Sequence, residues 1–196
     1  MPRDRRNLID GGYYHILTRG TDRKVLFKQD QDYRVFIALV AKYLNTYSIS
    51  ILHYCLMNNH IHLLLKLDGA GDLPKFMQGI LQSYANYYRK QYDSIGFLFQ
   101  NRYKSILIDS ERYLLEAARY IERNPLRAKI VCMLEEYSWS SYLHYAYGNV
   151  DKLIYQPSSD YIALGVTRES RQLKYMEFID VDRVYDELID EALKLA

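Results

Sequence analysis

The chain has 196 residues, a formal net charge of +2 and 49% hydrophobic residues. This length and composition fit one globular domain, with room for a modest appendage, and exclude a globally disordered chain. The longest apolar runs, such as Ile61–Leu65, are too short to cross a bilayer, and the polar start predicts no signal peptide. Cys55 and Cys132 form no CxxC motif and are typical of free thiols in a reducing compartment, so we expect a cytoplasmic protein without membrane contact.

Hydrophobic periodicity predicts alternating strands and helices. Strands are expected at residues 13–18, 49–57, 60–67 and 103–108, and helices at 31–47, 72–92 and 111–123. In chain order the first six elements match the ferredoxin-like split βαβ core, an α+β fold with an antiparallel sheet and helices on one face. The pattern weakens beyond Val131, where a C-terminal helical extension is expected. We therefore predict a core domain over 1–147 and an extension with an acidic helix over 148–196.

The charge is distributed unevenly along the chain. The segment Met176–Ala196 has seven acidic and two basic residues, a net of −5, so the remainder carries +7. A basic body is typical of a protein that binds a polyanion, but a globular domain with a solvated acidic helix has the same composition. If the acidic segment lies against a nucleic-acid groove, it competes with the substrate for that groove.

Two histidines form the sharpest local pattern. In a strand, His60 and His62 point to one face while Ile61 and Leu63 point into the core. Two imidazoles at this spacing can share a divalent metal ion. A pair of surface or hydrogen-bonded histidines produces the same pattern, so spacing alone leaves both interpretations open.

A tyrosine stripe follows on the last helix of the core. Tyr120 and Asn124 are four residues apart and share a helical face, which Tyr113 and Ala117 continue. Such a stripe is typical of a hydrophobic core. It indicates chemistry only if Tyr120 faces the histidines, because a phenol is a weak nucleophile at neutral pH and attack on a phosphodiester needs a metal ion to neutralise developing charge. The tyrosines at 84, 87 and 88 are competing candidates for a nucleophile.

Cations and aromatic side chains alternate between Phe97 and Lys104. Arg102 and Lys104 are expected on one strand face, and Arg19 ends the first strand. Single-stranded nucleic acid is bound by such mixtures because cations contact phosphates and rings stack on bases. An amphipathic strand with solvated cations is the alternative.

Taken together, these segments resemble the single-tyrosine HUH transposases, in particular the REP-associated tyrosine transposase group. The resemblance spans roughly residues 5–147 and rests on GYYHILTRG at 12–20, MNNHIHLL at 57–64, NRYKS at 101–105, YIERNPLRA at 120–128 and WSSY at 139–142. It implies that His60 and His62 are metal ligands, that Tyr120 is the nucleophile and that Asn124, one turn later, is the third ligand. The chain departs from many relatives at Asn58, where they have proline.

The resemblance also implies an activity. It is that of a metal-dependent single-stranded DNA endonuclease and strand transferase, with Mg²⁺ or Mn²⁺ as cofactor. Tyr120 would form a 5′-phosphotyrosine intermediate at a DNA hairpin, and Arg19, Arg102, Lys104 and Arg127 are the expected DNA contacts. A relative that binds DNA hairpins without cutting and a binder of RNA are the alternatives. Relatives act as monomers or homodimers, and both states stay open here.

Overall fold

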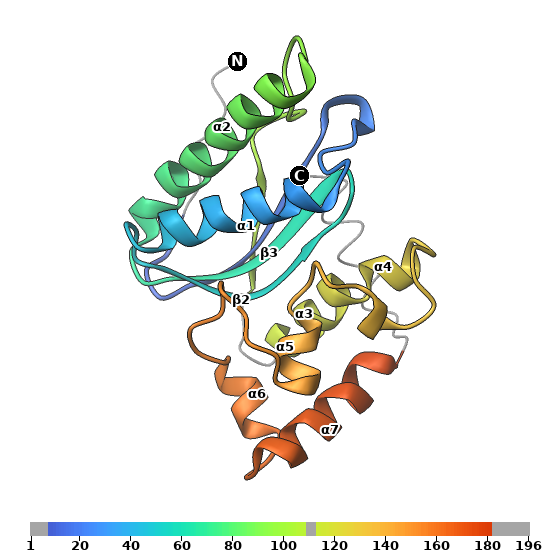
Figure 1. Ribbon diagram of the computed structural model, residues 1–196. Helices are drawn as coiled ribbons and strands as arrows, with labels where there is room; N and C mark the ends of the chain where they lie inside the picture. The colour runs from blue at the N-terminus through green and yellow to red at the C-terminus, as the bar shows by residue number, and fades with distance from the viewer. Residues whose placement is uncertain (1–7, 109–112, 182–196) are drawn as a thin grey trace.

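The sheet at the centre of the molecule has four antiparallel strands. The computed structural model describes residues 8–108 and 113–181 (Figure 1). The strands are β1 (Tyr13–Arg19), β2 (Ile49–Leu56), β3 (His60–Leu67) and β4 (Lys104–Ile108). They pair in the order β2-β3-β1-β4, so β1 and β3 are central. This is the strand order of the split βαβ fold, and the predicted α+β class is confirmed.

The helices follow the order that periodicity predicts. They are α1 (Asp30–Leu44), α2 (Leu73–Tyr92), α3 (Leu114–Glu122), α4 (Asn124–Arg127), α5 (Tyr142–Tyr147), α6 (Ser159–Ala163) and α7 (Arg168–Asp180), with 3₁₀ turns at Thr21–Arg23, Ala70–Asp72 and Leu134–Glu136. None of the helices in the described residues is long and apolar enough to span a membrane. The predicted core elements differ from the observed ones by a few residues at their ends, and β3 has the predicted bounds.

Alternation along the central strands produces two apolar surfaces. Tyr14 and Ile16 of β1, with Ile61 and Leu63 of β3, pack into the larger hydrophobic cluster under α1 and α2. The intervening residues point to the opposite face, where α3 contributes Ile121 and its neighbours to a second cluster. Figure 1 shows α1 and α2 on one side of the sheet and α3 on the other. The predicted helical layer is thus present, and α3 adds partial cover to the second face.

The tyrosines of α2 belong to the larger hydrophobic cluster, on the sheet face that α1 and α2 cover. Tyr84 Oη donates to the carbonyl oxygen of Leu26 at 2.7 Å, and Tyr88 Oη donates to that of Val25 at 2.9 Å. Tyr87 Oη donates to a carboxylate oxygen of the buried Asp32 at 2.8 Å. These three hydroxyls hold the segment that leads into α1, on the sheet face away from the histidine pair. Each of these three hydroxyls thus has a structural hydrogen-bonding role.

Residues 148–181 pack against the rest of the described chain. Leu153, Tyr161, Tyr175 and Ile179 join the same large hydrophobic cluster as the strands. Helix α7 begins after Thr167, whose Oγ1 accepts the backbone N–H of Ser170 at 3.2 Å. The predicted C-terminal helix is therefore present from 168 to 180, and the acidic residues from 182 onward lie outside the described residues. A short helix within the extension, α6, begins at residue 159 behind the Ser158 cap, where periodicity predicts no distinct element.

Candidate active site

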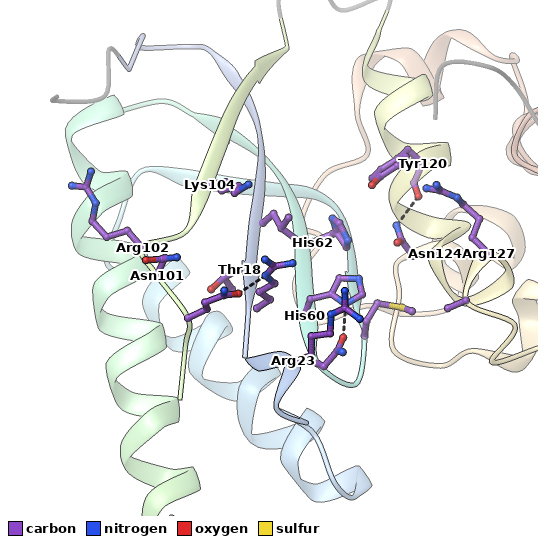
Figure 2. A pocket seen from close by; sticks show the side chains of 16 residues that line it. Thr18, Arg23, His60, His62, Asn101, Arg102, Lys104, Tyr120, Asn124 and Arg127 are labelled. Carbon is purple, nitrogen blue, oxygen red and sulfur yellow. Dashed lines mark hydrogen bonds between the residues drawn. The ribbon is translucent and has the colours of Figure 1, made fainter. Parts of the chain in front are cut away.

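A single open cavity brings together the residues that the sequence singled out. Its volume is about 670 Å³, and it lies between the exposed end of the central strands and the α3–α4 segment (Figure 2). All eight predicted site residues line it: His60, His62, Tyr120, Asn124, Arg19, Arg102, Lys104 and Arg127. Among the described residues, Tyr120 is the one tyrosine in its lining.

The sheet register positions the histidines. His60 pairs with Arg19 across β1 and β3, and His62 pairs with Leu17. Both histidines lie on the sheet face that α3 covers, so their side chains point toward Tyr120 of that helix. The His60 and His62 ring centroids are 4.9 Å apart, and the Tyr120 ring lies 5.8 Å from that of His62 in an edge-on arrangement. Tyr120 therefore faces the histidine pair, which is the arrangement that a chemical role for this tyrosine requires.

Burial keeps the imidazoles neutral near pH 7. It lowers the pKa of His60 to about 4, with hydrogen bonding to Asn124 opposing the shift and the charge of Arg19 adding to it. It lowers the pKa of His62 well below the usual value, helped by His60, His15 and Arg127. A neutral imidazole has a nitrogen lone pair free for a metal ion or a hydrogen bond. The pair is thus suited to ligation without first losing protons.

A third histidine, which the sequence interpretation did not single out, completes the cluster. His15 of β1 is 1% exposed, and its Nε2 lies 2.9 Å from Nδ1 of His62. Its ring is also 5.7 Å from the Tyr120 ring. Burial lowers the pKa of His15 to about 3. The signal was present in the segment GYYHILTRG, where His15 alternates with the core residues Tyr14 and Ile16, but the strand pairing that places it beside His62 is not visible in one sequence.

Asn124 sits one turn after Tyr120 and faces the histidines. Its side-chain N–H group donates to the carbonyl oxygens of Tyr120 at 2.8 Å and Ile121 at 3.2 Å. Because these bonds engage the amide nitrogen, the amide oxygen is the atom available to accept a hydrogen bond from His60. This agrees with the hydrogen bonding to Asn124 that raises the His60 pKa. In Figure 2, Tyr120 and Asn124 extend from α3–α4 toward the β3 histidines.

The four predicted cations surround this centre in different ways. The Arg127 guanidinium lies over the Tyr120 ring, 4.9 Å from its centroid, so it contacts the tyrosine as well as the cavity. Lys104 pairs with Leu17 across β1 and β4, and burial followed by the charge of Arg19 lowers its pKa. Arg19 Nε donates to Gln100 Oε1 at 2.5 Å.

One prediction about these cations is wrong. Arg102 does not share a strand face with Lys104, because β4 begins at Lys104 and Arg102 lies in the preceding bend. The bend still carries the exposed Arg102 side chain to the cavity rim. Arg23, from the 3₁₀ turn after β1, lines the same cavity and adds a fifth cation.

The residues flanking Tyr120 anchor its helix to the C-terminal part of the chain. The fully buried Glu122 accepts from His53 Nδ1 at 3.0 Å, from Tyr175 Oη at 2.7 Å and from Ser141 Oγ. Arg123 donates to the carbonyl oxygen of Ile179 at 3.0 Å. Sequence analysis assigned no role to Glu122 and Arg123, because their partners lie 19 to 69 positions away and only the fold brings them together.

The fold and the cavity define an α+β protein of the split βαβ type, with a histidine pair on one sheet face opposite a helix-borne tyrosine. The family model described as "Transposase IS200 like" matches residues 9–124, which is more than half of the chain. The chain therefore belongs to the IS200-like transposase family.

A solved structure shows the same fold. A REP-associated tyrosine transposase, solved bound to a REP hairpin, is similar with a TM-score of 0.63 and 19% identity, covering 80% of this chain and 92% of that one. A candidate transposase from Deinococcus radiodurans R1 matches at 18% identity and a TM-score of 0.42, over 62% of this chain and 97% of that one. No curated protein sequence matches the chain.

Proposed function

We propose that this transposase-family protein is a metal-dependent single-stranded DNA endonuclease and strand transferase that acts at DNA hairpins. The observation that carries the proposal is the cavity, which combines Tyr120, two neutral histidines and several cations in one place. A nucleophile, a set of metal donors and phosphate-binding groups are the three components that phosphodiester transfer needs.

The donor set fits a divalent cation. Nδ1 of His60 is engaged by Asn59 Oδ1 at 2.7 Å and Nδ1 of His62 by His15 Nε2, so Nε2 is the atom of each ring left for ligation. The amide oxygen of Asn124 is the third donor, and amide oxygens suit hard cations such as Mg²⁺ or Mn²⁺. Within residues 8–108 and 113–181 no group of three or more histidine, cysteine or acidic side chains suited to a metal ion occurs, which is consistent with an amide as the third donor.

Such an ion, when bound by His60, His62 and Asn124, would polarise the scissile phosphate and offset its developing charge. Tyr120 Oη attacks the phosphorus, and the bond from phosphorus to the 3′-oxygen breaks. The phenol loses a proton and the departing oxygen gains one, which leaves a 5′-phosphotyrosine and a free 3′-hydroxyl. In the reverse step a 3′-hydroxyl attacks the phosphotyrosine, rejoins a strand and restores the phenol. The covalent link conserves the phosphodiester energy, so the protein needs no nucleotide cofactor.

The charge around the cavity supports a DNA partner. Arg19, Arg102 and Lys104 line it, and Figure 2 shows Arg102 and Lys104 on the side opposite Tyr120. Cations that contact the phosphate backbone of DNA give sequence-independent affinity, whereas additional contacts determine which hairpin is bound. A REP hairpin is the ligand in the similar solved structure, and this supports the choice of a hairpin as the substrate class here.

The test uses labelled DNA hairpins with single-stranded flanks, varied in stem and flank sequence, incubated with the full chain and Mn²⁺. Denaturing gels and mass spectrometry should detect a covalent adduct on Tyr120. Tyr120→Phe should abolish the adduct, whereas the control Tyr155→Phe, an exposed position away from the cavity, should not change it. An adduct that persists in Tyr120→Phe would refute the assignment of the nucleophile, and hairpin binding without any adduct would favour a non-cutting binder.

A further inference from the structure

His15 occupies the middle of β1, between the two strands that pair with it. It lies opposite Leu64 of β3 and Ile106 of β4, on the same sheet face as His62. It is almost fully buried, and its ring contacts both the His62 and the Tyr120 rings at centroid distances of 5.1 and 5.7 Å. A buried imidazole placed between a proposed ligand and a proposed nucleophile needs an explanation beyond filling space, because an apolar side chain would pack there without a polar atom to satisfy.

The hydrogen bond between the two histidines has two possible senses. If His62 Nδ1–H donates to His15 Nε2, the lone pair of His62 Nε2 stays free. If His15 Nε2–H donates instead, His62 accepts on Nδ1 and carries its own proton on Nε2, where a metal ion would have to bind. Only the first sense leaves His62 competent as a ligand through Nε2, so the tautomer of His15 that accepts this bond selects the ligating form of His62.

Nothing else in the described part of the chain fixes the His62 ring in this way. The bond to His15 is the hydrogen bond that the His62 side chain makes there. Its cross-strand partner on β2 is Cys55, whose thiol is directed to Met57 Sδ at 3.6 Å. His60 meets the His62 ring edge-on and is itself engaged by Asn59. His15 is thus the group that can select both the tautomer and the orientation of His62.

We propose that His15 is a positioning residue that accepts the Nδ1–H of His62 and so presents His62 Nε2 to the divalent metal ion. The proposal rests on the function proposed above. Metal-bound histidines in proteins commonly donate their second ring N–H to a neighbouring acceptor, usually a carboxylate, a carbonyl or water, and loss of that acceptor costs about 10- to 100-fold in metal affinity or activity. In this protein the acceptor is a third imidazole.

The first measurement needs no DNA and no metal. The chain has five histidines, so long-range ¹H–¹⁵N spectra of the metal-free protein can resolve each ring. His62 should be protonated on Nδ1 and unprotonated on Nε2. A His62 ring protonated on Nε2 in the wild-type protein would overturn the proposal.

The second measurement compares two variants at one position. His15→Phe keeps a ring of similar size but has no acceptor, whereas His15→Gln offers a carbonyl oxygen to His62 Nδ1. Mn²⁺ affinity, measured by electron paramagnetic resonance, should fall about 10- to 100-fold in His15→Phe and largely recover in His15→Gln. His144→Gln, at a histidine on α5 outside the cavity lining, is the matched control and should bind Mn²⁺ as the wild type does.

Hairpin binding in the presence of a chelator should be the same in all four proteins, because His15 lies beneath the cavity and does not line it. Wild-type Mn²⁺ affinity in a folded His15→Phe would overturn the positioning role. If His15→Phe does not fold, the wild-type tautomer and the His15→Gln affinity decide the question. A wild-type protein that binds Mn²⁺ in a His15-dependent manner but forms no adduct would refute the endonuclease proposal and leave the role of His15 intact.

Discussion

The anchoring of α3, the helix that carries Tyr120, can be measured through one hydroxyl group. Tyr175 of α7 donates to Glu122 Oε2 at 2.7 Å, and neither side chain is exposed to solvent. Tyr175→Phe removes this donor but keeps the ring, which packs against Tyr145 and Tyr161 at 5.3 and 5.4 Å. The volume change is small, so the effect reports the hydrogen bond and the desolvated carboxylate that it leaves behind.

A hydrogen bond to a charged group contributes about 1.5–3 kcal/mol, and Glu122 keeps the donors His53 and Ser141, so we expect a loss of about 2 kcal/mol. For a chain of this size that corresponds to a fall in Tm of about 4–8 °C. Urea unfolding followed by circular dichroism gives the free energy of unfolding. Tyr155→Phe, which alters an exposed hydroxyl, should stay within about 0.5 kcal/mol of wild type.

A double-mutant cycle isolates the pair. Glu122→Gln alone and combined with Tyr175→Phe should show a coupling energy of about 1 kcal/mol or more, since the two groups share one hydrogen bond. Unfolding free energies that are additive, or a Tyr175→Phe variant as stable as the wild type, would refute the view that this bond holds α3 to α7.

Three further outcomes are expected. Gly79→Ala should lose about 1–2 kcal/mol in thermal melts, because a Cβ there would lie 2.4 Å from the Tyr43 ring and this clash outweighs the gain of about 1 kcal/mol in helix propensity; an unchanged Tm would contradict that clash. Arg19→Ala and Lys104→Ala should each weaken hairpin binding and reduce the slope of log affinity against log salt by about 1, and an unaltered slope would remove that residue from the phosphate contacts. Truncation after Val181, which removes an acidic segment and leaves α7 in place, should raise hairpin affinity at low salt if that segment competes with DNA; equal affinity would end that hypothesis.

The sequence predicted the elements whose hydrophobic pattern is long and clear. Strand β3 has its predicted bounds because the Asn58-Asn59 turn marks its start and the mostly apolar run continues to Leu67. Helix α6 was missed because it has only five residues and depends on the Ser158 cap more than on periodicity. Periodicity also says nothing about which sheet face a helix covers, so the position of α3 opposite α1 and α2 required the structure.

The same limit applied to the site. Spacing placed His60 with His62, and Tyr120 with Asn124, because each pair is local. The resemblance joined the two pairs, and the cavity lining is where the structure brings them together. His15 was beyond reach because its relation to His62 depends on β1–β3 register across 47 residues.

The order in which the chain leaves the ribosome matters for α3, because its contacts to the C-terminal part of the chain are made by residues synthesised later. The strands that carry the histidines are complete by Ile108, whereas the carbonyl acceptors of Arg119 and Arg123 belong to Ile179, Asp180 and Val181. A nascent chain that has emerged only as far as α5 has the sheet but lacks those acceptors, since domains form as their segments appear. The hydrogen bonds that hold the helix bearing Tyr120 therefore form last. A prematurely terminated chain retains the histidine pair but lacks the contacts that fix the position of Tyr120.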